Sequence, residues 1–123
     1  MPTQIINSER MFQMWKYTVG HGQLLLRSTK APDFPTRIDV FFKGVTAIHL
    51  PTCFTGLSIE EGTEADVEKL CTLRESSSFN GGIKVYRVEG ADFLGYVAAS
   101  MVACHEDEGE YYDPSFFAKN NLI

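Results

Sequence analysis

The chain has 123 residues, of which 44% are hydrophobic and 12% aromatic, so it is long enough to bury a core and unlike the polar chains that stay disordered. Its net charge of −5 argues against a nucleic-acid partner, because phosphate binding needs a clustered basic surface. Residues 1–15 lack the apolar segment of a signal peptide, and no apolar run reaches the ~18 residues of a membrane span. We therefore expect a cytoplasmic protein without membrane contact.

The first half of the chain, residues 1–61, reads as a series of short strands. Residues 12–19 and 23–29 flank Gly20-His21-Gly22 and predict a β-hairpin, and the prolines of 31–35 then predict a loop. Residues 36–43 alternate between apolar and polar side chains, which is typical of a half-buried strand. Further strands are expected at 45–50, which Pro51 ends, and at 57–61.

The second half of the chain begins with the one helix that the sequence predicts. Thr63 is the predicted helix cap, and the acidic residues Glu64 and Asp66 follow it in the first turn. Apolar residues at helical spacing continue to Cys71, and residues 76–82 end the helix. A strand follows at 83–88. Residues 93–104 are apolar on both faces, which predicts a single central strand. Residues 105–114 are expected to form an acidic loop, and Phe116 and Phe117 to pack back onto the body.

These elements predict one domain spanning residues 1–123, because no repeat or linker divides the chain. The fold class is α+β: mainly antiparallel β, with six to seven strands and one helix, arranged as a curved sheet or a partly open barrel. Too few helices are present to connect parallel strands.

The sequence carries no recognisable catalytic, cofactor or metal motif. Three cysteines at wide spacing, Cys53, Cys71 and Cys104, predict free thiols buried as small hydrophobic residues. A thiol–imidazole pair of Cys104 with His105 is disfavoured because neighbouring strand residues point to opposite faces. Zinc spacing and a phosphate-binding glycine loop before a helix are both missing, so we expect no cofactor.

Charge is distributed unevenly along the chain. Residues 1–58 carry six basic and three acidic side chains, whereas residues 59–123 carry five basic and thirteen acidic ones. The densest acidic stretch lacks the spacing of a calcium-binding loop. Either it is a solvated loop or it binds a basic protein partner, and then we expect it to be dispensable for folding. The candidate partner-binding residues are Glu106, Asp107, Glu108, Glu110, Tyr111 and Tyr112.

Three segments, WKYTVGHGQLLLRS, TRIDVFFKGVTAIHLPT and GLSIEEG, together resemble small bacterial proteins of unknown function. The resemblance covers about half of the chain, its motifs are specific, and it implies a bacterial origin. It implies no activity.

The leading hypothesis is a non-catalytic protein–protein interaction module, such as an immunity-type inhibitor of a basic toxin or a regulatory subunit. Self-association into a homo-oligomer is a further alternative. The alternative is a small-ligand-binding protein or an enzyme whose site lies in the concave face of the sheet. Trp15, Tyr17, Tyr86 and Tyr96 would line that site, with Arg37, Asp39 or His49 as its polar groups.

Overall fold

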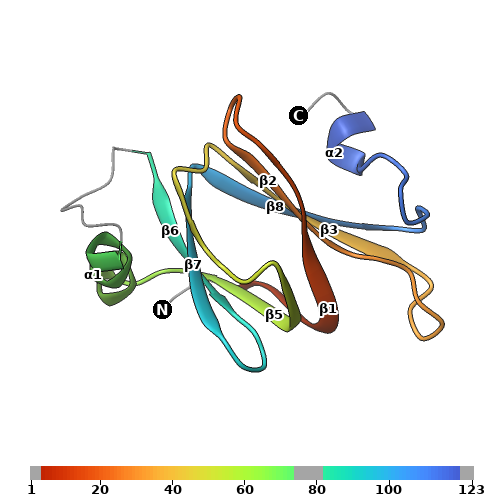
Figure 1. The fold of residues 1–123 in the computed structure, drawn as a ribbon, viewed down its shortest axis with the longest axis horizontal. Coiled ribbons are helices and arrows are strands. Elements are labelled where there is room, and N and C mark those ends of the chain that lie inside the picture. The colour runs from red at the N-terminus through yellow and green to blue at the C-terminus, as the bar shows by residue number, and fades with distance from the viewer. Residues whose placement is uncertain (1–3, 74–81, 120–123) are drawn as a thin grey trace.

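The computed structural model describes residues 4–73 and 82–119. Its elements are β1 (Gln4–Thr18), β2 (Gln23–Ser28), β3 (Arg37–Lys43), β4 (Ala47–His49), β5 (Cys53–Glu61), α1 (Glu64–Leu73), β6 (Lys84–Glu89), β7 (Leu94–Ala99), β8 (Met101–Asp107) and α2 (Phe116–Lys119). Figure 1 shows the two helices at opposite ends of the molecule. No helix within the described ranges has the length and apolar character needed to cross a membrane.

The strands form one open antiparallel sheet in the order β4-β7-β6-β5-β1-β2-β3-β8. The predicted class, α+β with mainly antiparallel strands, is confirmed. The predicted number of six to seven strands is wrong, because the described residues form eight. The prediction of one helix is also wrong, since the tail contains the short helix α2.

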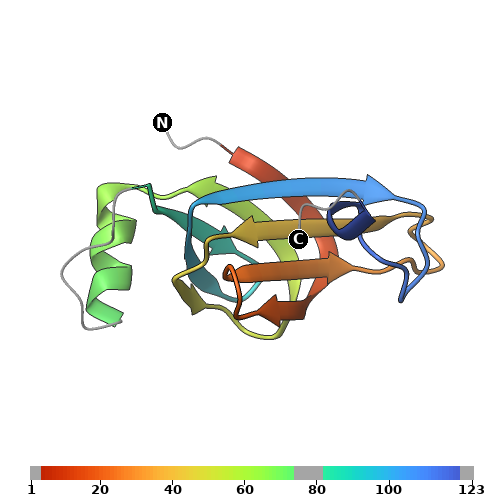
Figure 2. The same cartoon turned by 90° about the horizontal axis from the view of Figure 1, so that it is seen from above.

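The strand predicted over residues 93–104 is in fact two strands, divided at Ser100. The backbone N–H and the hydroxyl of Ser100 both donate to the carbonyl oxygen of Lys43, at 2.9 and 2.8 Å. Opposite it, Gly44 has a φ of 68°, and a Cβ at Gly44 would collide with the Ser100 side chain. The paired chains therefore bend at this point, so that β3/β8 and β4/β7 lie in different parts of the curved sheet (Figure 2).

This bend places β7 and β8 in different environments. β7 lies between β4 and β6, whereas β8 is an edge strand that pairs with β3. The apolar residues of 93–104 therefore do not share one central strand. Only the β7 part is almost wholly buried, and no residue of β8 is buried.

The main core fills the inner face of the curved sheet. It contains Phe12, Leu24, Val40, Phe42 and Val97, each with 0% of its surface exposed. Neighbouring residues on the strands point to the opposite, outer face. Two separate elements cover that outer face: α1 covers β6 and β7, and the C-terminal segment covers β2 and β3.

The covering helix α1 begins as the sequence predicts. Asp66 accepts a hydrogen bond from the N–H of Thr63 at 2.8 Å, and its own N–H donates to the Thr63 hydroxyl at 3.4 Å, so the cap is reciprocal. Leu70 then packs with Val85 and Tyr96. The predicted helix end at 76–82 lies almost wholly outside the described residues.

Candidate partner-binding site

The acidic segment begins as a strand. Residues 105–107, expected to open a loop, continue β8, where Asp107 is paired with Arg37 and His105 with Asp39 across the ladder. The chain then leaves the sheet, and we call residues 108–115 the strap. The strap runs over the outer face of the sheet towards α2, where Phe117 stacks on Phe41 with ring centroids 4.9 Å apart.

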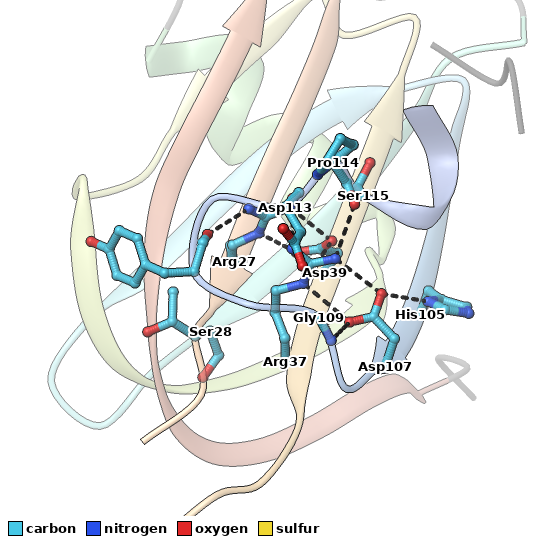
Figure 3. Close-up of polar contacts among 12 residues, drawn as sticks. Arg27, Ser28, Arg37, Asp39, His105, Asp107, Gly109, Asp113, Pro114 and Ser115 are labelled. Atoms are coloured by element: carbon cyan, nitrogen blue, oxygen red, sulfur yellow. Dashed lines mark hydrogen bonds and ion pairs between the residues drawn. The ribbon is translucent and has the colours of Figure 1, made fainter. Parts of the chain in front are cut away.

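Arg37 holds the strap to the sheet from below. Its side chain has 0% of its surface exposed and makes a bidentate ion pair with Asp107. The Nε–Oδ1 distance is 3.1 Å and the Nη2–Oδ2 distance is 3.0 Å. The remaining N–H groups donate to the backbone carbonyls of Glu110 at 3.0 Å, Asp113 at 2.6 Å and Pro114 at 3.1 Å. Figure 3 shows this arrangement beneath the strap.

Arg27 holds the strap in a second place. Its guanidinium makes a bidentate ion pair with Asp39, with N–O distances of 2.7 and 3.1 Å. It also donates a hydrogen bond to the carbonyl oxygen of Tyr111 at 3.0 Å. Asp39 also lies 3.9 Å from Arg37, so one buried carboxylate serves both arginines. Burying charged groups is costly unless they are paired and hydrogen-bonded. The charges of Arg27, Arg37 and Asp39 are paired with one another in this way.

Local turns complete the shape of the strap. The carboxylate of Asp107 accepts the N–H of Gly109 at 2.8 Å, and that of Asp113 accepts the N–H of Glu110 at 2.9 Å. A Cβ at Gly109 would lie 2.5 Å from the guanidinium of Arg37, so only glycine lets the strap approach this closely. The conformation of the strap is therefore fixed through hydrogen bonds of its backbone to the side chains of two arginines and two aspartates.

This fixation turns the strap's carbonyls inward and leaves its acidic side chains outside. Four backbone carbonyls, those of Glu110, Tyr111, Asp113 and Pro114, face the two arginines. The side chains of Glu106, Glu108, Glu110, Tyr111 and Tyr112 are exposed, Tyr112 by 84%.

Asp107 differs from the other predicted site residues, because it points into the fold. Burial by itself would raise the pKa of Asp107, but hydrogen bonds from Arg37 and from the N–H of Gly109, together with the positive charge of Arg37, lower the pKa below its usual value. The carboxylate therefore stays ionised and positions the strap instead of offering itself to a partner. Glu110 forms an exposed ion pair with Lys30 at 3.0 Å, and Glu106 accepts a hydrogen bond from Thr36.

Trp15 of β1 forms an aromatic cluster with Tyr111 and Tyr112 of the strap. Its ring centroid lies 4.9 Å from that of Tyr111 and 5.9 Å from that of Tyr112, and the two tyrosine rings are 4.6 Å apart. The guanidinium of Arg27 lies 4.9 Å from the centre of the Trp15 ring. The sequence predicts Trp15 in the alternative concave site, but the structure places it against the strap. The register shift of β1 between Met14 and Lys16 made its direction impossible to read from alternation.

The residues proposed for a concave ligand site do not converge. Tyr86 is buried in the inner core against Phe42, and Tyr96 is buried under α1. His49 is exposed on β4. Arg37 and Asp39 do lie together, but the strap covers them.

Two open grooves lie elsewhere on the surface. One, of about 490 Å³, is lined by residues of β1, β5 and the β6–β7 turn, among them Asn7, Gly56 and Glu89. The other, of about 250 Å³, lies between β1 and β8.

The cysteines and histidines offer little chemistry in this structure. Cys104 shares the inner face with its ladder partner Val40, whereas His105 stacks on Phe116 on the outer face, so the two side chains point apart. Desolvation raises the pKa of the Cys104 thiol to about 11. All three cysteines are free, but Cys53 and Cys104 are exposed, so the prediction that all three are buried is wrong for these two. The described ranges hold no group of three or more His, Cys, Asp or Glu side chains arranged to bind a metal ion.

Comparison of the chain with protein-family models, with curated proteins and with solved structures finds no match.

Proposed function

We propose that the protein binds a basic surface of a partner protein through the strap and its aromatic cluster. The observation that carries this proposal is the inward orientation of four strap carbonyls towards Arg27 and Arg37, which leaves the acidic and tyrosine side chains outside. A surface loop whose backbone is already fixed loses little conformational entropy on binding. Such a loop is a better binding surface than a flexible acidic loop of the same composition.

Charge and side-chain type support the same proposal. Glu108 and Glu110 are exposed carboxylates of the strap, and acidic side chains accelerate encounter with a basic partner. Tyrosine and tryptophan are among the residue types that contribute most at protein interfaces, and two members of the cluster of Trp15, Tyr111 and Tyr112 belong to the same strap. An immunity-type inhibitor or a regulatory subunit would use this kind of binding. A basic toxin encoded beside this gene would favour the inhibitor.

The test is a comparison of two variants with equal charge. The strap variant carries Glu108→Gln, Glu110→Gln and Tyr112→Ser. The control variant carries Glu64→Gln, Glu68→Gln and Leu94→Ser, which change exposed residues of α1 and β7 instead. Each protein is immobilised, proteins from a lysate of the source cells are captured on it, and the captured proteins are quantified by mass spectrometry.

We expect a basic protein that is captured by the wild type and the control but lost with the strap variant. Its capture should weaken as salt is raised, because exposed charges are screened. If the strap variant and the wild type captured the same proteins in the same amounts, the strap would not be the binding surface.

A further inference from the structure

The free edge of β8 lacks several of the features that protect an edge strand, although it ends in two acidic residues. β8 pairs with β3 through seven consecutive residues without a register shift, from Arg37↔Asp107 to Lys43↔Met101. It contains no proline, lysine or arginine, and its first four residues, from Met101 to Cys104, are apolar. Within residues 4–73 and 82–119, no strand pairs with its other side. Natural proteins normally block such an edge with a bulge, a proline, a lysine or a very short strand.

The opposite edge of the sheet shows the contrast. There β4 has only three residues and is soon followed by Pro51. A strand of that length offers few backbone groups to another chain, so of the two terminal strands of the described sheet β8 is the one long and regular enough to take up an additional strand.

A groove lies between the last part of β8 and the first part of β1. Its volume is about 250 Å³, and it is lined by Cys104, His105 and Glu106 of β8, Ile38 of β3, and Ile6, Asn7 and Ser8 of β1. The part of β1 that lines the groove also lacks a second strand partner among the described residues, because β2 pairs with β1 only from Gln13 to Thr18. Free backbone edges and apolar side chains thus line the same groove.

We propose that an extended segment of a partner protein binds here as an additional antiparallel strand on the outer edge of β8. Backbone hydrogen bonds to β8 would provide much of the affinity, and alternate side chains would provide selectivity. A groove of this size, lined by Ile6, Ile38 and Cys104, suits a small apolar side chain such as valine. Glu106 at the same groove favours a lysine or arginine next to it in the bound segment.

The probe is an acetylated and amidated peptide of sequence Lys-Val-Thr-Val-Thr-Val-Thr-Lys, added to the wild-type protein. Binding is followed by backbone amide NMR and by hydrogen exchange. We expect the amides of residues 101–107 to shift and to gain protection. Two further peptides carry N-methyl groups on all valines or on all threonines, which removes the donors of one edge or of the other.

At least one methylated peptide should bind about tenfold or more weakly than the parent, because it has lost the bonds to β8. Cys104→Lys, which fills the groove, should weaken binding, whereas Cys104→Ser should not. The strap variant, with Glu108→Gln, Glu110→Gln and Tyr112→Ser, leaves Glu106 unchanged. It should bind the peptide normally, which separates the two proposals.

Three results would overturn the proposal. The first is no binding at millimolar peptide, and the second is equal binding of the parent and both methylated peptides. The third is protection of residues 101–107 that depends on protein concentration alone, which would show that a second copy of the chain occupies this edge.

Discussion

Replacing Arg37 by methionine removes the main attachment of the strap. Five hydrogen bonds are lost: two to Asp107 and one each to the carbonyls of Glu110, Asp113 and Pro114. Removing one partner of a buried ion pair costs about 3–5 kcal/mol, because the remaining charge is left without a partner. The side chain of Asp107 is 23% exposed, so water compensates in part and we expect the lower end of this range. At about 3–5 °C per kcal/mol for a chain of this size, Tm should fall by roughly 10–15 °C.

The only tryptophan of the chain reports on this change directly. Trp15 lies against Arg27 and Tyr111 under the strap, so its emission should shift to longer wavelength when the strap detaches. Unfolding by urea is followed by this emission and by circular dichroism. The control is Lys30→Met, which removes the exposed ion pair with Glu110 and should cost less than about 1 kcal/mol. An Arg37→Met variant as stable as this control would refute the reasoning, because α2 and its phenylalanines would then hold the strap alone.

Three more predictions follow from particular residues. Because its folded-state pKa is lowered, Asp107 stabilises the fold above the unfolded-state pKa near 3.9, and this contribution is lost as pH falls through the folded value. Asp107→Asn should therefore flatten the loss of stability below about pH 5 in acid titrations of the unfolding free energy, and an unchanged acid limb would contradict this. Thiol titration should find Cys53 and Cys104 reactive in the folded protein, with Cys104 slower because of its raised pKa, and Cys71 reactive only after unfolding. A total below three in denaturant would indicate a disulfide. Val97→Asp should abolish cooperative folding, since it buries an unpaired carboxylate at a position with 0% exposure, whereas Leu94→Asp at a 44% exposed position of the same strand should fold; a folded Val97→Asp would show that the core is elsewhere.

Local signals in the sequence were sufficient where one short segment decides the structure. The hairpin between β1 and β2 turns at His21 and Gly22, which have φ values of 69° and 54°, as the glycine-flanked turn predicts. The capped start of α1 at Thr63 is equally local. Apolar alternation likewise identified the strand β3, but the prediction that it is half-buried is wrong, because Arg37 and Asp39 on its expected polar face are both buried.

The division at Ser100 could not be predicted because it depends on a residue far away in the sequence. Residues 93–104 are apolar on both faces apart from Ser100, but β7 is covered on its outer face by α1 and β8 is not. What ends β7 is the contact of Ser100 with Gly44 and Lys43 across the ladder. Neither partner is visible from the apolar pattern itself.

The charge asymmetry that motivated the candidate site has two parts with different roles. Arg37 and Lys30 from the basic half pair with Asp107 and Glu110 from the acidic half, so part of the asymmetry is complementarity inside the fold. Asp107 was expected to be dispensable for folding, and its buried partner Arg37 argues against that. Nothing in the sequence distinguishes Asp107 from its neighbours, because the distinction comes from which face of β8 each residue occupies. Asp107 shares the outer face with His105, under the strap, whereas Glu106 lies on the other face at the groove. The acids that remain exposed on the strap, Glu108 and Glu110, are therefore the ones whose charge is available to a partner there, and the ion pair of Asp107 with Arg37 keeps the strap in the conformation that presents them.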